Sequence, residues 1–475
     1  MNLRFVKYGI IICSFIASNV FAQYGSIGSV DARSMGMGKT YTASTFGVYS
    51  IGLNPANMIL EDSIFIQFAT VFPLPTVSAR GGIDALSLDD VNYFFSGVDG
   101  ESRVLSESDK QRLNGLFSDG GYVSANTGVQ LLSFQIIPDK NIGAFAFAVS
   151  DFSGGVSKIP GAIVDLALNG NPVDKVFDFS DVEFQAWWIR NYSLSYARKF
   201  NDFGTGILKS IATGISIKLV HGFAYAGKRD VNSFLRTSNR NEISAEANYL
   251  AFTSFSDNFG VKYEFDSLDH HSGFQLFPGP AGTGFGLDLG LSFLLDNNTI
   301  ISLALTDIGS INWNRNTAKF IGEGSLFIDD LSDEAILDSL LDEFTETAEP
   351  AGEFSTGLAT AFRFGAAYRL SDFDEDNFPG YLLLAADYNH GFNNLPGNSS
   401  KPRYSFGFEW QVLDFLPLIR SGVDYSEVEG INWAFGLGYT TSLVDVNIAT
   451  NSFQTTFSPG STSNLSLSLS SRWKF

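Results

Sequence analysis

The chain is poor in charged residues and almost free of cysteine. Only 17% of its 475 residues are Asp, Glu, Lys or Arg, whereas soluble proteins carry about 25%. Thirty basic residues stand against 51 acidic ones, which gives a formal net charge of −21. Because nucleic-acid binding needs clustered Lys and Arg, we expect no nucleic-acid partner. One cysteine cannot form an internal disulfide, so a disulfide-rich scaffold is excluded.

Long apolar runs are also missing. Near the N-terminus, Arg4 and Lys7 precede a mostly apolar run from Tyr8 to Ala17, and Val20-Phe21-Ala22 follow. This pattern predicts a secretory signal peptide over residues 1–22, cleaved after Ala22. The run is too short to span a bilayer, which takes ~20 residues. No later stretch reaches 18 apolar residues, so we expect an exported protein without a transmembrane helix.

What the chain does have is alternation with a period of two residues. Every second residue from Leu465 to Phe475 is apolar except Ser471, and those between are Ser, Arg or Lys. Such a segment suits a tilted transmembrane β-strand, of which one face meets lipid and the other a polar lumen. The chain ends on Trp473 and Phe475. A terminal Phe on such a strand resembles the signal by which the barrel-assembly machinery recognises outer-membrane barrels during insertion.

The same alternation recurs upstream and predicts fourteen strands, with counts of 12 and 16 left open by uncertain boundaries. We therefore expect an all-β fold, a transmembrane antiparallel β-barrel over residues 63–475 in contact with outer-membrane lipid. With a periplasmic N-terminus, no periplasmic connection exceeds ten residues, as is typical of such barrels. Four long connections are then extracellular: 72–128, 151–183, 226–283 and 309–360. The predicted strands are 64–71, 129–137, 141–150, 184–200, 211–225, 284–295, 299–308, 361–370, 381–390, 404–412, 418–426, 431–440, 443–451 and 464–475.

Residues 23–62, which precede the first strand, are too many for a plain tail. They contain the stretch from Asp31 to Gly38 (DARSMGMG) and, later, Asn54-Pro55-Ala56. This segment resembles the N-terminal hatch of the FadL superfamily of outer-membrane barrels, and more closely its PorV-like branch. The stretch Asp307-Ile308-Gly309 with Trp313 is similar to uncharacterised Bacteroidota-type outer-membrane proteins. The resemblance implies a hatch inside the lumen, which is either a structural plug or a gate. Its marker residues are Arg33, Gly36, Gly38, Asn54, Pro55 and Ala56.

Motifs for catalysis or metal binding are weak. His270 and His271 are adjacent in a predicted outer loop, where they are most simply solvated. Asp372, Asp374 and Asp376 alternate like the start of a calcium loop, but the glycine at its sixth position is missing. No nucleophile–His–acid arrangement can be proposed. We therefore expect no enzymatic activity, no cofactor and no metal site.

The connection 309–360 has an unusual concentration of charge. From Phe320 to Phe362 there are eleven acidic residues and no basic one, which is most simply a solvated face. A helix capped by Ser332 is predicted within it. The apolar face of that helix needs cover, either from the barrel's own loops or from a protein partner. This candidate ligand or partner loop presents Leu337, Leu340, Leu341 and Phe344.

Two functions follow from these features. The first is the passage of small hydrophobic compounds across the outer membrane, as the FadL-like hatch implies. The alternative is a non-transporting barrel that binds protein partners at the acidic loop, as the PorV-like resemblance to components of a secretion machine implies.

Overall fold

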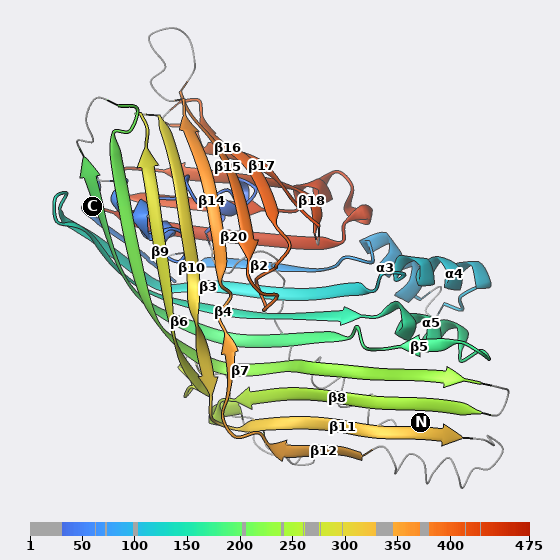
Figure 1. Ribbon diagram of the computed structural model, residues 1–475. Coiled ribbons are helices and arrows are strands. Elements are labelled where there is room, and N and C mark those ends of the chain that lie inside the picture. Colours follow the sequence, from blue (N-terminus) through green and yellow to red (C-terminus); the bar gives the residue numbers. More distant parts are fainter. Residues whose placement is uncertain are drawn as a thin grey trace.

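The computed structural model places every predicted strand in one closed antiparallel sheet (Figure 1). The predicted signal peptide, the paired histidines, the three alternating aspartates and the four apolar residues of the acidic loop lie outside the described residues. Those described are 31–61, 63–71, 74–97, 103–201, 206–238, 242–259, 261, 275, 277–296, 298–328, 345–370, 380–413, 415–427 and 429–475.

The barrel wall has fourteen strand positions, which confirms the predicted count. Each strand pairs with its neighbours in an antiparallel ladder, and the ring closes where the first position meets the last strand, β20. The first position is shared by β1 (Ile66–Thr70) and β2 (Thr76–Ile83). The others are β3 (Gly121–Asp139), β4 (Gly143–Ile159), β6 (Glu183–Asn201), β7 (Ser210–Thr237), β9 (Gly282–Leu294), β10 (Thr299–Trp313), β14 (Ala361–Arg369), β15 (Tyr381–Gly391), β16 (Arg403–Gln411), β17 (Leu418–Ser426), β18 (Gly430–Thr440), β19 (Val444–Thr450) and β20 (Asn464–Lys474).

The first strand position is interrupted only between β1 and β2. Thr70 pairs with Leu132 of β3 and Thr76 pairs with Gln130, so the two pairings are separated by one residue on β3 but by five residues in the first strand position. Pro75, just before β2, has no N–H to donate to a ladder. The wall stays continuous because β1 and β2 both pair with β3 and with β20.

The outer face of the barrel is apolar and the inner face is polar, as alternation demands. On β16, Tyr404 and Phe406 are exposed on the outside, whereas Arg403 and Ser405 are buried inside. The buried polar and charged side chains point inward, while Phe, Leu, Tyr and Trp side chains form most of the exposed outer band. This arrangement is typical of a barrel surrounded by lipid.

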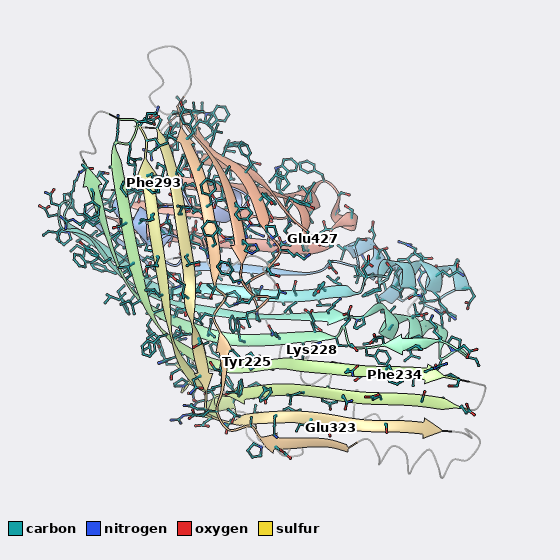
Figure 2. All side chains as sticks on the ribbon, viewed as in Figure 1. Tyr225, Lys228, Phe234, Phe293, Glu323 and Glu427 are labelled. Atoms are coloured by element: carbon teal, nitrogen blue, oxygen red, sulfur yellow. The ribbon has the colours of Figure 1, made fainter. Side chains whose placement is uncertain are left out.

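Beyond the barrel, several strands continue into an outer sheet (Figure 1). The second half of β7 pairs with β8 (Ile243–Phe255), β8 with β11 (Thr317–Ile328), and β11 with β12 (Thr345–Pro350). Two short strands, β5 (Val176–Asp178) and β13 (Phe354–Gly357), pair with β7 and β10. Figure 2 labels Lys228 and Phe234 on β7 and Glu323 on β11 in this outer part.

The outer sheet corrects the expectation that 226–283 and 309–360 are loops without strands. The side chains of β8 are almost all half-buried, so neither face is clearly apolar. A strand with two half-exposed faces has no alternation to detect. The predicted strand 211–225 is too short, since β7 runs on to Thr237. The missing alternation also explains why the outer half of β7 is not predicted.

Three helices cap the outer ends of β2, β3 and β4 (Figure 1): α3 (Leu88–Phe95), α4 (Glu107–Leu116) and α5 (Gly161–Asn169). Capping boxes begin the first two, with Ser87 and Asp90 in α3 and Ser106 and Asp109 in α4. Short 3₁₀ turns lie at η3 (Asp257–Phe259), η4 (Phe453–Thr456) and η5 (Pro459–Ser461). Among the described residues, no helix has the length and apolar character needed to cross a membrane.

The lipid-facing assignment predicts a depth-dependent cost for a charge on the outer face. Phe406 lies in the middle of β16 and is 55% exposed, and Phe415 lies in the short turn before β17 and is 71% exposed. We expect Phe406→Arg to lower the free energy of unfolding by ~2–4 kcal/mol in lipid vesicles, and Phe415→Arg by ~0–1 kcal/mol. Equal effects of the two substitutions in urea titrations would show that Phe406 does not face the hydrocarbon core.

Candidate functional site

Residues 31–61 lie inside the barrel and form what we call the plug (Figure 1, dark blue). It consists of α2 (Ala32–Gly36), η1 (Gly47–Ser50) and η2 (Pro55–Ile59). Asp31 caps α2 by accepting from the Ser34 N–H at 2.8 Å and from its hydroxyl at 2.6 Å. Asn54 caps η2 by accepting from the Ala56 N–H at 3.1 Å, with Pro55 at the first helical position.

The plug lies so close to the wall that glycines are required at the contact. A Cβ at Gly407 of β16 would lie 2.1 Å from the Met37 carbonyl oxygen, and one at Gly290 of β9 would lie 2.1 Å from Asn54 Oδ1. Of the predicted hatch residues, Gly36 packs against Gly436, and Gly38 has a φ of +65° that favours glycine. These approaches leave no room for larger residues.

Arg33, another predicted hatch residue, forms a two-pronged ion pair between plug and wall. Its Nε and Nη2 donate to the two carboxylate oxygens of Glu409 on β16, at 2.8 and 2.9 Å. Glu409 Oε2 also accepts from Arg420 Nε of β17 at 2.5 Å. All three side chains are largely buried, with Glu409 only 5% exposed. One carboxylate therefore holds one cation of the plug and one of the wall.

A second carboxylate is shared in the same way, and a third joins plug and wall through a single arginine. Glu429 pairs with Lys39 of the plug at 2.9 Å and with Arg80 of β2 at 2.5 Å. At the end of the plug, Glu61 accepts from Arg472 of β20 at 2.6 and 2.8 Å. Buried ion pairs of this kind fix the plug against the wall, because separating a pair would leave a charge without its counter-ion in a place with little water.

Hydrogen bonds from uncharged donors complete the attachment. Asp387 of β15 accepts from the backbone N–H groups of Tyr41 and Thr42 at 2.9 and 2.8 Å and from the Thr42 hydroxyl at 2.7 Å. Asn54 donates to Ser292 Oγ of β9 at 3.2 Å. Sequence reasoning missed these wall residues. Their only signal is that Asp387, Glu409, Arg420, Glu429 and Arg472 are charged residues in or beside segments that otherwise predict lipid-facing strands.

The predicted insertion signal lies where the barrel closes. Phe475 exchanges backbone hydrogen bonds with Ile66 at 2.8 and 2.9 Å. The ring of Phe68 on β1 stacks with those of Trp473 and Phe475, with centroids 6.0 and 5.9 Å apart. The two C-terminal aromatics thus pack against the first strand, and their role in recognition by the assembly machinery stays a prediction.

A small, partly open cavity lies between the plug and the barrel wall. On the plug side it is lined by Asp31, Val48 and Tyr49. On the wall side the lining residues of β2, β3, β4 and β6 are mostly small or polar, including Ser78, Gly128, Ala148, Ser150 and Ser193.

Aromatic side chains gather at the outer side of the cavity, where β7 and β10 leave the barrel. Trp313 is fully buried, its ring centroid is 5.3 Å from that of Tyr225, and its Nε1 donates to Thr356 Oγ1 at 2.8 Å. Figure 2 labels Tyr225 at this bend. We call this group the mouth cluster; its main members are Phe152, Trp187, Tyr225, Trp313 and Phe354.

Plug, cavity and mouth cluster follow one another along the same strands. On β4, Ala144 and Ala146 pack against the plug, Ala148 and Ser150 line the cavity, and Phe152 belongs to the mouth cluster. The same order holds on β6, from Ala197 through Ser193 to Trp187. The lumen is therefore layered along its axis.

Within the described ranges, no three His, Cys, Asp or Glu side chains are grouped so that they could hold a metal ion. His221 and His390 lie on the barrel strands β7 and β15. The ring of His221 packs edge-on against that of Tyr192, with centroids 5.0 Å apart, and the ring of His390 stacks with that of Tyr388, with centroids 6.4 Å apart.

Residues 65–458 match a family described only as a family of unknown function (DUF5723). No curated protein matches the chain. Among solved structures, the chain is similar to the toluene transporter TbuX of Ralstonia pickettii, with 12% identity and a TM-score of 0.45 over 94% of this chain and 98% of that one. It is also similar to the toluene transporter TodX of Pseudomonas putida, with 12% identity and a TM-score of 0.45 over 94% and 96%. It is similar as well to a FadL homologue of Pseudomonas aeruginosa, with 12% identity and a TM-score of 0.46 over 95% of this chain and 99% of that one. At these values the likeness assigns no substrate to this chain.

The shared carboxylate of Glu409 predicts a large effect of a small change. Glu409→Gln leaves Arg33 and Arg420 buried without their counter-ion, so we expect the free energy of unfolding to fall by ~3–5 kcal/mol. Glu427→Gln, which removes an exposed pair with Lys401, is the control and should cost ~0–1 kcal/mol. Urea unfolding in lipid vesicles measures both. A Glu409→Gln protein as stable as the control would contradict the clamp.

Proposed function

Since the chain belongs to the family of unknown function DUF5723, whose description names no activity, we propose a function from the structure: an outer-membrane barrel that lets small hydrophobic compounds pass. The apolar outer band and the polar interior support the membrane location. The outer membrane is the natural site, because an exported barrel of this type is inserted there.

The observation that carries the proposal is the layered lumen. A solute that arrives from outside passes the mouth cluster, whose aromatic side chains are buried against one another, must part to admit it and then offer apolar contact. It then reaches the cavity, where Val48, Tyr49, Ile51 and Ala148 provide apolar surface between polar groups. Small wall residues leave the space that the plug does not fill, and a ligand site of this kind is concave and only partly polar.

Entry of a neutral hydrophobic dye tests this proposal. N-phenyl-1-naphthylamine is excluded by an intact outer membrane and fluoresces once it reaches phospholipid inside the cell. We expect cells that make the protein to take up the dye faster than cells with an empty vector. Ser150→Trp, which fills the cavity, should return the rate to that of the empty vector.

The matched control for Ser150→Trp is Phe147→Trp. Phe147 lies on the same strand, β4, but faces outward and is 39% exposed, so the same new side chain points away from the lumen. We expect its dye entry to equal that of the wild type. Passage through the cavity is ruled out if Ser150→Trp, folded and inserted at the wild-type level, admits dye at the wild-type rate.

A second candidate function, binding of a protein partner outside the cell, is favoured by the outer sheet. Of the described strands, only β11 pairs with β12, so the other edge of β12 is open to a further strand. The apolar residues of the acidic loop directly precede β12 in the sequence. Pull-down with and without residues 326–348 tests this function, and an unchanged set of partners would remove this loop from it.

A further inference from the structure

An irregularity in β10 turns an extra side chain into the lumen. Leu305 pairs with Leu289 of β9, but Ile308 pairs with Leu287, so two residues of β10 face Asp288 alone. Regular alternation would direct only one of them inward, yet Thr306 and Asp307 are both buried. Asp307 has a φ of +57°, which is uncommon for a residue with a side chain. Bulges of this kind often re-aim a side chain at a functional site.

The re-aimed Asp307 joins a charged group with an excess of negative charge. Lys218 Nζ on β7 lies 2.7 Å from Asp288 Oδ1 and 2.6 Å from Asp307 Oδ1. The three residues are between 0% and 4% exposed. One ammonium therefore faces two carboxylates away from bulk water, where an uncompensated charge is unfavourable.

Each carboxylate uses only one of its oxygens. Asp288 Oδ1 also accepts from the Asp307 N–H at 2.8 Å, but Oδ2 of both aspartates is buried and has no hydrogen-bond partner. The hydroxyl of Thr306 beside them is likewise unpartnered. Buried acceptors are normally satisfied, so such a set indicates a missing donor.

The charged groups around the cavity leave the two free oxygens without a donor. Asp307 and Lys218 both line the cavity. Of the other charged groups there, Asp151 is paired with Arg190, and Asp31 accepts from Ser34. Arg363 on the neighbouring strand β14 adds positive charge near Asp307, and it donates to the backbone oxygens of Gly52 and Leu53 in the plug.

We propose that the cavity binds a small organic cation, whose ammonium group donates to the free oxygen of Asp307. The ammonium supplies the missing donor, and the rest of the molecule occupies the cavity toward Ser150 and Phe152. A divalent metal fits less well, because Lys218 already stands between the carboxylates and the described residues offer no third acidic ligand. The inference deepens the proposed function, since it names a chemical class for a solute in the same cavity.

Calorimetric titration of the detergent-purified protein with propylammonium chloride tests the site, with sodium propionate as the anionic match. We expect propylammonium to bind at one site per chain and propionate not to bind. Asp307→Asn should weaken binding by about tenfold or more, because it replaces a charge-assisted hydrogen bond by a neutral one. Glu427→Gln, at an exposed pair outside the cavity, should bind as the wild type does.

Ser150→Trp keeps the Lys218–Asp288–Asp307 group and fills the cavity, so it should abolish binding even if Asp307→Asn fails to fold. The inference is overturned if the wild type does not bind propylammonium, or if propionate or the Ser150→Trp protein binds equally well. Binding is measured without transport. Binding together with failed dye entry would therefore reject only the passage, and dye entry without binding would reject only the cation site.

Discussion

The carboxylate of Glu409, held between Arg33 of the plug and Arg420 of the wall, shows the constraint on which the rest of the structure depends. Charges inside the barrel are shielded from bulk water, so each must find its counter-ion within the protein. The structure meets this need by sharing carboxylates between plug and wall. Glu429 does the same for Lys39 and Arg80. The plug is thus a part of the interior that completes the charge balance of the wall.

The same constraint explains where the lumen is open. At the α2 end of the plug, Arg33 pairs with Glu409 of β16, and Lys39 pairs with Asp424 of β17 and with Glu429, whereas β3, β4 and β6 present Gly, Ala and Ser to the space beside the plug. Small neutral residues need no counter-ion, so that side can stay hollow without an electrostatic cost. The exception is the Lys218–Asp288–Asp307 group at the edge of the cavity, where charges do not cancel. Structure and electrostatics therefore separate an anchored half of the lumen from an accessible half.

Most of the barrel could be predicted from the sequence because a strand between lipid and a polar lumen repeats strictly every two residues. Even the short turns between β18 and β19 or β9 and β10 followed from the ends of that alternation. The outer sheet could not be predicted, because β8 has two half-buried faces and no such period. The bulge at Asp307 could not be predicted either, since it breaks the alternation that identifies a strand. In the plug, glycines and the Asn54-Pro55 turn are local signals, but the partner of Arg33 is 376 residues away, and no local pattern identifies it.

The plug, near the N-terminus, is attached to β20, the C-terminal strand, and this has a consequence for how the protein assembles. The Ala32 N–H donates to Ser470 Oγ, 438 positions later, and Arg472 reaches back to Glu61. These contacts cannot form until the final strand has been synthesised and exported. Contacts this distant in sequence cost much loop-closure entropy and slow folding. Until β20 arrives, Glu61 at the end of the plug has no Arg472 to pair with, so the final strand both closes the wall and completes the attachment of the plug.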